Sequence, residues 1–462
     1  MTDSWANFGV DLHLDLTGPG LRVGLTDALR KAVRTGRLSP GTRLPSSRTL
    51  AADLGMARNT VADAYAELVA EGWLTARQGS GTQVARRAAP RAAKRAVTPR
   101  RPVRLGPVHN LNPGTPDLAS FPRTEWLKAA RKALSAAPHE AFGYGDPRGR
   151  IELRTVLAEY LARARGVYAD PDRIVVCSGF VHGLMLMGKV LRSRRVREVA
   201  VESYGLDVHW DLLTDAGLHT PALPFDELGS QTGALGREGA VLMTPAHQFP
   251  IGVPLSPDRR AAAVDWARGS GGLILEDDYD GEFRYDRQPV GALQGLDPER
   301  VVYFGTASKS LAPGLRLAWM VVPQDAVGEV LDAKGPHDLS SSPDQLTLAE
   351  FIASGAYDRH IRANRLRYRR RRDQLVAALA ERAPDVRVHG IAAGLHAVLE
   401  LPPGTEQSVV QAAAWQGLAL EGVSRYRHVD APAGRDALVV GYGTPPDSAY
   451  AAALDALCRV LP

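Results

Sequence analysis

A single lysine, Lys309, lies in a loop whose residue types could carry out covalent chemistry. The loop 305–316 reads GTASKSLAPGLR, so small and hydroxyl-bearing residues surround the lysine, and Arg316 follows it. A lysine amine can form an imine with an aldehyde, and hydroxyl groups together with an arginine can hold a phosphate. The apolar run Val301 to Phe304 before the loop is typical of a buried strand. We therefore expect the loop to hold an aldehyde that carries a phosphate.

A second stretch, residues 272–280 (GLILEDDYD), is an apolar strand that ends in carboxylates and a tyrosine. Asp277 could keep a pyridine nitrogen protonated through a charge-assisted hydrogen bond. Tyr279 lies two residues further on, on the same side of an extended chain, and could donate to a ring oxygen. An aldehyde, a phosphate and a pyridine ring with an acidic partner together describe pyridoxal 5'-phosphate (PLP). The sequence thus predicts PLP as the cofactor, with Lys309 as its imine-forming residue.

The phosphate of PLP needs donors from more than one element. By residue type, the donors expected from the lysine loop are Thr306, Ser308 and Arg316. Backbone N–H groups at the N-terminus of a helix also bind anions. We expect such a terminus just after the apolar run 173–177, at Ser178, Gly179 and Phe180.

The carboxylates of the second stretch leave one other interpretation open. Asp277, Asp278 and Asp280 could hold Mg²⁺, because carboxylates bind hard cations. No phosphate-binding Gly-x-x-x-x-Gly-Lys-Ser/Thr motif accompanies them in the sequence. We therefore expect no metal at this site.

The composition bounds the class of protein. The 462 residues are 45% hydrophobic and 23% charged, which is ordinary for a globular chain of more than one domain. The two cysteines, Cys177 and Cys458, do not suggest a disulfide framework. Neither a signal-peptide pattern nor a long apolar run is present. We expect a soluble, cytoplasmic protein that is not membrane-bound.

Strand and helix patterns alternate through the larger, C-terminal part of the chain, which predicts an α/β fold with a mostly parallel sheet flanked by helices. The expected strands are 173–177, 199–201, 240–243, 272–276, 301–304 and 317–322. Ligands of such folds bind beyond the carboxyl ends of the strands, where the candidate residues cluster. A long arginine-rich helix over 359–381 should lead into a smaller α+β subdomain, with a strand at 438–442 and a last helix at 448–460.

The N-terminal part has a different pattern, that of a winged helix–turn–helix. Apolar residues at helical spacing predict one helix ending before Gly36, a second opening at Ser46, and a third from about Arg58 to Glu71. Residues 73–77 and 82–84 then predict a hairpin. The third helix of such a domain enters the major groove with its N-terminal end. The residues expected to contact double-stranded DNA are Arg43, Ser46, Arg48, Arg58, Asn59, Thr60, Arg77 and Gly79.

Three segments follow from these patterns: a DNA-binding domain over 16–84, a linker over 85–108 and a PLP-binding body over 109–462. The linker is rich in alanine, proline and arginine and should be extended and mobile. No acidic residue occurs between Gly72 and Pro116, so the linker either follows DNA phosphates or serves only as a solubilising tether.

The head motif (GTRLPSSR at 41–48, RNTV at 58–61 and RQGSGT at 77–82) closely resembles the GntR family of bacterial regulators. One departure is Ala57, where that family often has serine. An alanine N-cap should weaken the third helix by roughly 0.5–2 kcal/mol.

The body resembles the fold type I aminotransferases, and the whole chain resembles the MocR subfamily, in which a GntR head is fused to such a body. The matching stretches include NPGTPD at 112–117, YGDPRG at 144–149 and TPAHQFPIG at 244–252. The resemblance implies that Tyr144 reaches the PLP phosphate of a partner subunit, and hence a homodimer whose heads read paired half-sites. It also implies that His247 lies beside the cofactor, and that PLP, an amine or an amino acid is the effector.

Two departures from the subfamily bear on activity. Leu206 falls where a tyrosine usually stacks on the pyridine ring, so either Tyr204 shifts in or an aliphatic chain covers the ring. Arg425 and Arg427 are candidates for an effector carboxylate, but the strand 438–442 lacks the arginine of true aminotransferases. We therefore favour a regulator that senses PLP, an amine or an amino acid through Lys309. The alternatives are an active aminotransferase with an accessory DNA-binding domain, and a DNA-binding module whose body has lost the cofactor.

Overall fold

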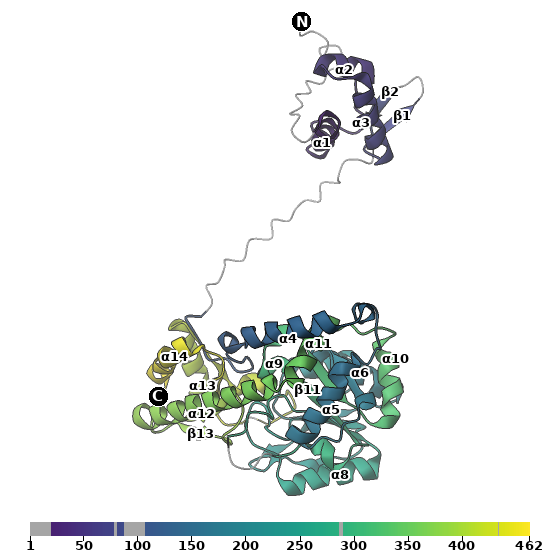
Figure 1. The fold of residues 1–462 in the computed structure, drawn as a ribbon. Helices are drawn as coiled ribbons and strands as arrows, with labels where there is room; N and C mark the ends of the chain where they lie inside the picture. The colour runs from purple at the N-terminus through teal and green to yellow at the C-terminus, as the bar shows by residue number, and fades with distance from the viewer. Residues whose placement is uncertain (1–19, 78–80, 87–106, 286–289, 433) are drawn as a thin grey trace. The chain divides into compact units, whose positions relative to one another are not determined.

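The computed structural model describes residues 20–77, 81–86, 107–285, 290–432 and 434–462. The chain divides into two compact units, Met1–Leu105 and Gly106–Pro462. We call them the head and the body (Figure 1). Gly79 and most of the predicted linker lie outside the described residues.

The described residues of the head form three helices followed by a two-stranded antiparallel hairpin. Its elements are α1 (Leu21–Arg34), α2 (Ser47–Leu54), α3 (Arg58–Ala70), β1 (Leu74–Arg77) and β2 (Gly81–Val84). The predicted helical spacing places Leu25, Leu29, Leu50 and Leu68 in one buried core. Gly55 ends α2 in the left-handed conformation that glycine adopts without strain. This is the predicted winged helix–turn–helix.

The body is built on a seven-stranded sheet with the order β4-β12-β11-β10-β9-β5-β6. The strands are β4 (Ile174–Cys177), β5 (Val199–Glu202), β6 (Ala222–Leu223), β9 (Ala240–Met243), β10 (Leu273–Asp277), β11 (Val301–Thr306) and β12 (Ala318–Val321). Neighbours pair in parallel except for β12, which runs antiparallel to β11 and β4. The predicted mostly parallel sheet is confirmed.

The register of the sheet brings the chemistry-bearing segments to one edge. Asp277 on β10 lies opposite Phe304 on β11, and Thr306 at the end of β11 lies opposite Ala318 on β12. Ala318 in turn lies opposite Cys177, the last residue of β4. The segments after β4, β10 and β11, and the segment before β12, therefore meet beyond the carboxyl ends of the parallel strands.

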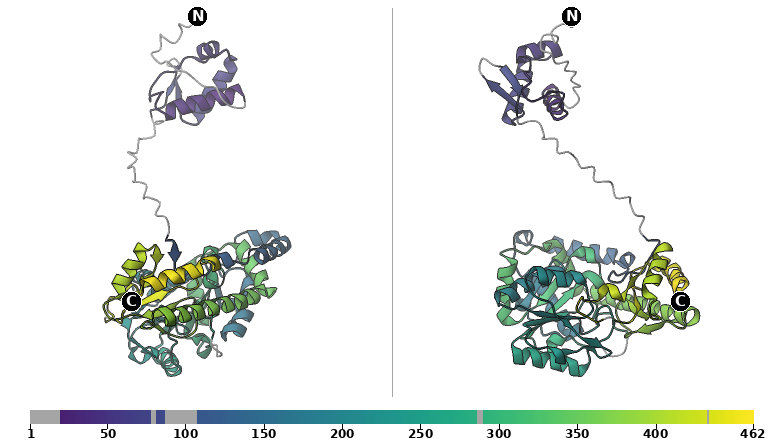
Figure 2. Two further views of the ribbon diagram at one scale, coloured as in Figure 1. Left: turned by 90° about the vertical axis from the view of Figure 1, so that its left-hand side faces the viewer. Right: turned by 180° about the vertical axis from the view of Figure 1, so that it is seen from behind.

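Helices cover both faces of this sheet (Figures 1 and 2). Alternate strand residues point to opposite faces, so Val175 and Phe304 pack with α6, α7 and α10, whereas Val176 and Tyr303 pack with α5 and α11. α8 packs on β9 and β10. These helices, with α4 and the short α9, are α4 (Arg123–Ala136), α5 (Ile151–Arg165), α6 (Phe180–Ser193), α7 (Asp207–Asp215), α8 (Pro257–Ser270), α9 (Ala307–Ser310), α10 (Val327–Lys334) and α11 (Ser342–Ala353).

A smaller C-terminal subdomain completes the body, as predicted. Its four-stranded antiparallel sheet has the order β13-β14-β17-β16. Its elements are α12 (Ala356–Arg382), β13 (Arg387–His389), β14 (Ala397–Glu400), α13 (Glu406–Trp415), β16 (Glu421–Gly422), β17 (Ala437–Val440) and α14 (Asp447–Val460). The remaining short pairs are β3 (His109–Asn110) with β15 (Leu418–Ala419), and β7 (Phe225–Asp226) with β8 (Gly229–Ser230).

Candidate functional site: a cavity at the carboxyl edge of the sheet

A cavity of about 490 Å³ lies at this edge, between the large sheet and the C-terminal subdomain. Its volume is within the range of small-molecule sites. The predicted residues that line it are Phe180, Tyr204, Asp277, Tyr279, Thr306, Ser308, Lys309, Arg316 and Arg425. Residues far apart in the sequence thus converge on one space.

Lys309 lies on α9, which follows β11 directly, and β11 ends at the carboxyl edge of the sheet. Its ammonium donates to the backbone oxygen of Gly114. Burial lowers the pKa of the Lys309 amine, and the carboxylates of Asp277 and Asp280 only partly oppose this effect. A lowered pKa favours the neutral amine, which is the form that attacks an aldehyde.

Asp277 ends β10 and is 9% exposed. Among the described residues its carboxyl has no hydrogen-bond or ion-pair partner. Burial raises its pKa to about 8, against the opposing charge of Lys309. A buried carboxyl without a partner needs a donor to stabilise its charge. A pyridine nitrogen in the cavity would supply that donor, so Asp277 fits the predicted role.

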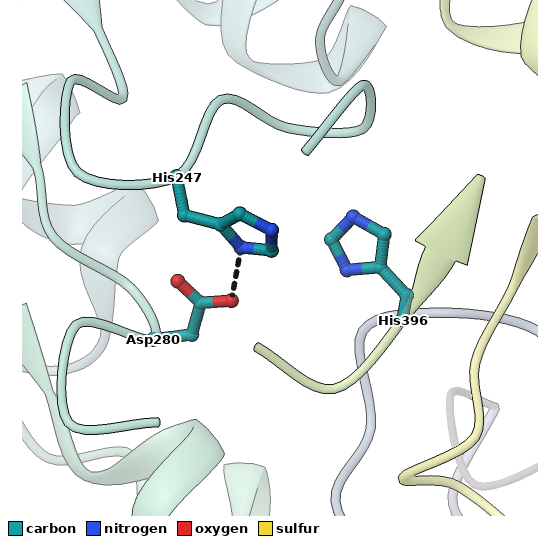
Figure 3. A group of neighbouring side chains, drawn as sticks. All are labelled: His247, Asp280 and His396. Atoms are coloured by element: carbon teal, nitrogen blue, oxygen red, sulfur yellow. Dashed lines mark hydrogen bonds and ion pairs between the residues drawn. The ribbon is translucent and has the colours of Figure 1, made fainter. Parts of the chain in front are cut away.

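Tyr279 connects the cavity to a buried cluster of His247, Asp280 and His396 (Figure 3). The Tyr279 hydroxyl lies 3.1 Å from Nδ1 of His247, and the same nitrogen lies 2.8 Å from the Asp280 carboxylate. His396, just before β14, donates from Nε2 to the backbone oxygen of Pro250 at 2.9 Å, and burial lowers its pKa to about 4. Side-chain N and O atoms of the three cluster residues lie within 4.8 Å of one another. His247 itself does not line the cavity; it positions Tyr279, which does.

The expected phosphate end of the cavity combines Arg316 with the N-terminus of α6. Nη2 of Arg316 donates to the backbone oxygen of Ser178 at 2.6 Å. A Cβ on Gly179 would lie only 2.6 Å from the same nitrogen, so the arginine fits there because the residue is glycine. Thr306 caps α9 by accepting from the backbone N–H of Ser308 at 3.1 Å. Thr306, Ser308, Arg316 and Phe180 thus share one cavity wall. The Ser178 N–H differs from the prediction, because it donates to Nδ1 of His182 at 3.1 Å.

Leu206 and Tyr204, the two candidates for covering the pyridine ring, both line the cavity. The ring of Tyr204, however, lies edge-on to Phe225 with 6.4 Å between the ring centroids, and its hydroxyl lies 1.9 Å from where a Cβ on Gly434 would be. The Tyr204 side chain is thus directed toward the C-terminal subdomain.

Sequence reasoning missed several residues of the cavity wall, among them the ionisable Glu202, His209 and His396. Glu202 ends β5, and burial raises its pKa to about 7 although the hydroxyls of Ser230 and Thr244 donate to it. His209, on α7, lies against Phe180 with 4.7 Å between ring centroids, and burial lowers its pKa to about 4. The position of Glu202 at a strand end could have revealed it.

Arg425 and Arg427 have different surroundings. Arg425 lines the cavity and forms an ion pair of 2.7 Å with Asp207 at the start of α7. Arg427 is exposed and absent from the cavity wall. Tyr144 is 88% exposed, stacks on His337 and also does not line the cavity of its own chain.

The predicted DNA-contacting residues that the structure describes are exposed, except for the half-buried Thr60. Arg58 and Asn59 are exposed at the start of α3, and Thr60 is half-buried beside them. Ser46 caps α2, since its hydroxyl accepts from the backbone N–H of Thr49 at 3.1 Å. Ala57 is the N-cap of α3 and provides no side-chain hydrogen bond, as expected. The exposed arginines of the predicted set are Arg43, Arg48, Arg58 and Arg77.

Comparison with known families accounts for both units. Residues 21–84 match bacterial regulatory proteins of the gntR family, and residues 107–428 match aminotransferases of class I and II. The chain is 31% identical to the probable rhizopine catabolism regulatory protein MocR of Rhizobium meliloti, over 87% of this chain and 86% of that protein. The chain belongs to the MocR-type GntR regulators.

Other members of this group are similarly related. The pyridoxine biosynthesis transcriptional regulator PdxR of Corynebacterium glutamicum is 33% identical over 87% of this chain and 88% of its own length.

Among solved structures, an archaeal alanine:glyoxylate aminotransferase has a TM-score of 0.68 at 24% identity, covering 76% of this chain and 90% of its own. The latter similarity supports the body's fold. None of the described helices is long and apolar enough to cross a bilayer.

Family membership agrees with the geometry of the cavity. The class I and II aminotransferase domain binds PLP, and this chain retains the groups that such a cofactor needs. The Lys309 amine, the unpartnered Asp277 carboxyl and the Arg316 guanidinium line one cavity, and Gly179 lies against Arg316. The predicted cofactor, PLP, therefore fits the residues present.

Proposed function

We propose that this protein is a PLP-dependent transcriptional regulator that senses PLP, or an amine or amino acid reacting with it, through an imine at Lys309. The observation that carries the proposal is that the Lys309 amine, whose pKa is lowered, and the unpartnered carboxyl of Asp277 line the same cavity. A GntR head in the same chain supplies the DNA-binding function.

PLP supplies an aldehyde for the lysine and a protonated ring that withdraws electrons. In the proposed complex, Asp277 accepts a hydrogen bond from the ring nitrogen, and Tyr279 donates to the ring oxygen while His247 holds its hydroxyl. Thr306, Ser308, Arg316 and the N–H groups of Gly179 and Phe180 would bind the phosphate, since the Ser178 N–H donates to Nδ1 of His182 at 3.1 Å. Tyr144 of a second subunit completes that end, so the regulator acts as a homodimer.

On DNA, the two heads of the dimer would read paired half-sites. Arg58, Asn59 and Thr60 would meet base edges in the major groove, and the other predicted side chains would meet phosphates. The proposed domain bounds are 16–84 for the head, 85–108 for the linker and 109–462 for the body. Because the target is chromosomal DNA, we place the protein in the cytoplasm.

Two relatives bear on the effector. PdxR is named for pyridoxine biosynthesis, which favours PLP itself as the signal. An aromatic-amino-acid aminotransferase of Thermococcus litoralis is 27% identical over 71% of this chain. That similarity, with Arg425 at the cavity wall as a carboxylate partner, is the reason to test for transamination as a second function.

The decisive experiment is optical. Purified protein mixed with PLP should gain a near-visible absorption band, and borohydride should fix one cofactor mass on the lysine of peptide 305–316. Lys309→Ala should lose both signals, whereas Lys132→Ala, a change at an exposed lysine on α4, should retain them. A wild-type protein that takes up no PLP would overturn the proposal.

The link to transcription needs a second measurement. A promoter fragment next to the gene should be retarded by the wild-type protein, and PLP should change its affinity. Lys309→Ala should still bind the fragment but ignore PLP. Rapid transamination by wild type, with no effect of PLP on DNA affinity, would favour the enzyme instead.

A further inference from the structure

A second cavity, of about 450 Å³, lies in the body on the other side of Tyr204. Both halves of the body contribute to it. The segment after β6 supplies Phe225 and Glu227, and the C-terminal subdomain supplies Val398, Glu400, Val423 and Arg435. Tyr204 lines this cavity and the cofactor cavity alike.

The floor of the second cavity is apolar. Ile251, Val398, Val423 and Ala437 are each at most 8% exposed and belong to one hydrophobic cluster. The ring of Phe225 stands edge-on to Tyr204 at the wall. Such a floor favours an apolar group of side-chain size, and aromatic rings at the wall favour another ring.

The rim carries charges of both signs. Arg435 lies between two carboxylates, 3.5 Å from Glu227 and 3.4 Å from Glu400. Arg435 and Glu227 are 68% and 71% exposed, so these ion pairs contribute little to stability and can exchange partners. Asp226, by contrast, is paired with Arg259 at the base of the rim.

We propose that the second cavity binds a large apolar α-amino acid without covalent chemistry. The apolar side chain would fill the floor against Phe225 and Tyr204. The ligand carboxylate would pair with Arg435, and its ammonium would take the place that Arg435 holds beside Glu227 and Glu400. A zwitterion satisfies all three rim charges, whereas a simple hydrocarbon satisfies none of them.

The occupant would influence the cofactor cavity through the segment 204–206. The backbone oxygen of Tyr204 accepts from the Gln248 amide at 2.9 Å, and the Gly205 N–H donates to the backbone oxygen of Tyr426 at 2.8 Å. Leu206, the next residue, lines the cofactor cavity. A ligand in contact with Tyr204 therefore touches a residue that also lines the cofactor cavity.

The test uses full-length Lys309→Ala protein without PLP, so that no imine chemistry contributes. Calorimetric titration with L-phenylalanine should give one saturable site per chain. Val423→Trp, which fills the cavity, and Arg435→Glu, which reverses the rim charge, should each weaken binding by about tenfold or more. Arg197→Glu, at an exposed position outside the cavity, should bind like its parent. L-alanine, phenylacetate and phenethylamine should bind more weakly than L-phenylalanine.

The outcomes separate this site from the cofactor site. Absence of saturable binding, or binding that both cavity variants retain, overturns the proposal and leaves PLP sensing untouched. Circular dichroism of each variant shows whether it is folded. If Val423→Trp fails to fold, the surface change Arg435→Glu still decides the question.

Discussion

The head and the body present their functional groups in opposite ways. In the head, Arg43, Arg48, Arg58 and Arg77 are exposed side chains. In the body, Asp277 is buried and Lys309 is half-buried, and burial shifts the pKa of each toward its neutral form. An exposed charge contributes little binding energy until a partner displaces its water, whereas buried groups are already desolvated when the ligand arrives.

This difference sets what each unit can do. A surface of solvated arginines gives salt-dependent attraction to any DNA, and only a few contacts to base edges add sequence preference. The amine and the carboxyl in the body's cavity instead favour a ligand whose donors and acceptors complement both groups. Changes in the body should therefore affect one ligand strongly, and changes in the head should divide between specific and general binding.

The largest expected effect is on PLP affinity in Asp277→Asn. Loss of a charged hydrogen bond costs about 1.5–3 kcal/mol, which corresponds to roughly 10- to 150-fold weaker binding. Titration of the absorption band measures the affinity. Asp211→Asn, on the exposed side of α7, is the matched control and should bind PLP normally. Equal affinity of Asp277→Asn and wild type would remove Asp277 from the site.

The counterpart in the head is Arg58→Ala. Loss of one bidentate contact to a base costs about 1–3 kcal/mol, so affinity for the operator should fall while affinity for unrelated DNA changes little. Gel retardation at fixed salt with both DNAs measures this ratio. Arg34→Ala, in the last turn of α1, should preserve it. A uniform loss on both DNAs would make Arg58 a phosphate contact instead.

The sequence predicted most of the fold because periodicity and strand ends are local properties. The helices of the head and the main strands of the body appeared within a few residues of the predicted positions. Asp277 and Lys309 could be grouped because parallel strands end at a common edge. Arg316 joins them because it lies just before β12, which runs antiparallel to β11.

What the sequence could not supply depends on side-chain direction and on contacts across the fold. Whether Tyr204 faces the cofactor or the C-terminal subdomain is decided by Phe225 and Gly434, which are distant in sequence. The second cavity exists because the β6–β8 region and the C-terminal subdomain approach each other there. The sequence of α7 does not show that His209 lies against Phe180, which is distant in the chain.

The stability of the body should also depend on pH through Asp277. Burial raises the pKa of Asp277 to about 8 in the folded protein, so between about pH 4 and pH 8 the folded state binds more protons than the unfolded state. Stability from this group is therefore present at low pH and lost as the pH rises. Without PLP, the stability of Asp277→Asn relative to wild type should increase between about pH 4 and pH 8, by at most roughly 1.4 kcal/mol per pH unit. Chemical denaturation of the body at a series of pH values measures the difference, and a constant difference would contradict the raised pKa.

The smallest expected effect sharpens the separation of the two units. Ala57 is the N-cap of α3 and leaves its first N–H groups without a side-chain acceptor. Ala57→Ser should supply one and stabilise the head by about 0.5–2 kcal/mol. Calorimetry should show the head's transition moving to higher temperature while the body's transition stays, because the two units are separately compact. Ala62→Ser, exposed in the middle of α3, is the control and should not stabilise, since a serine inside a helix caps nothing. If both transitions moved together in Ala57→Ser, the head and the body would unfold as one cooperative unit, and the contrast between them would hold for their chemistry but not for their stability.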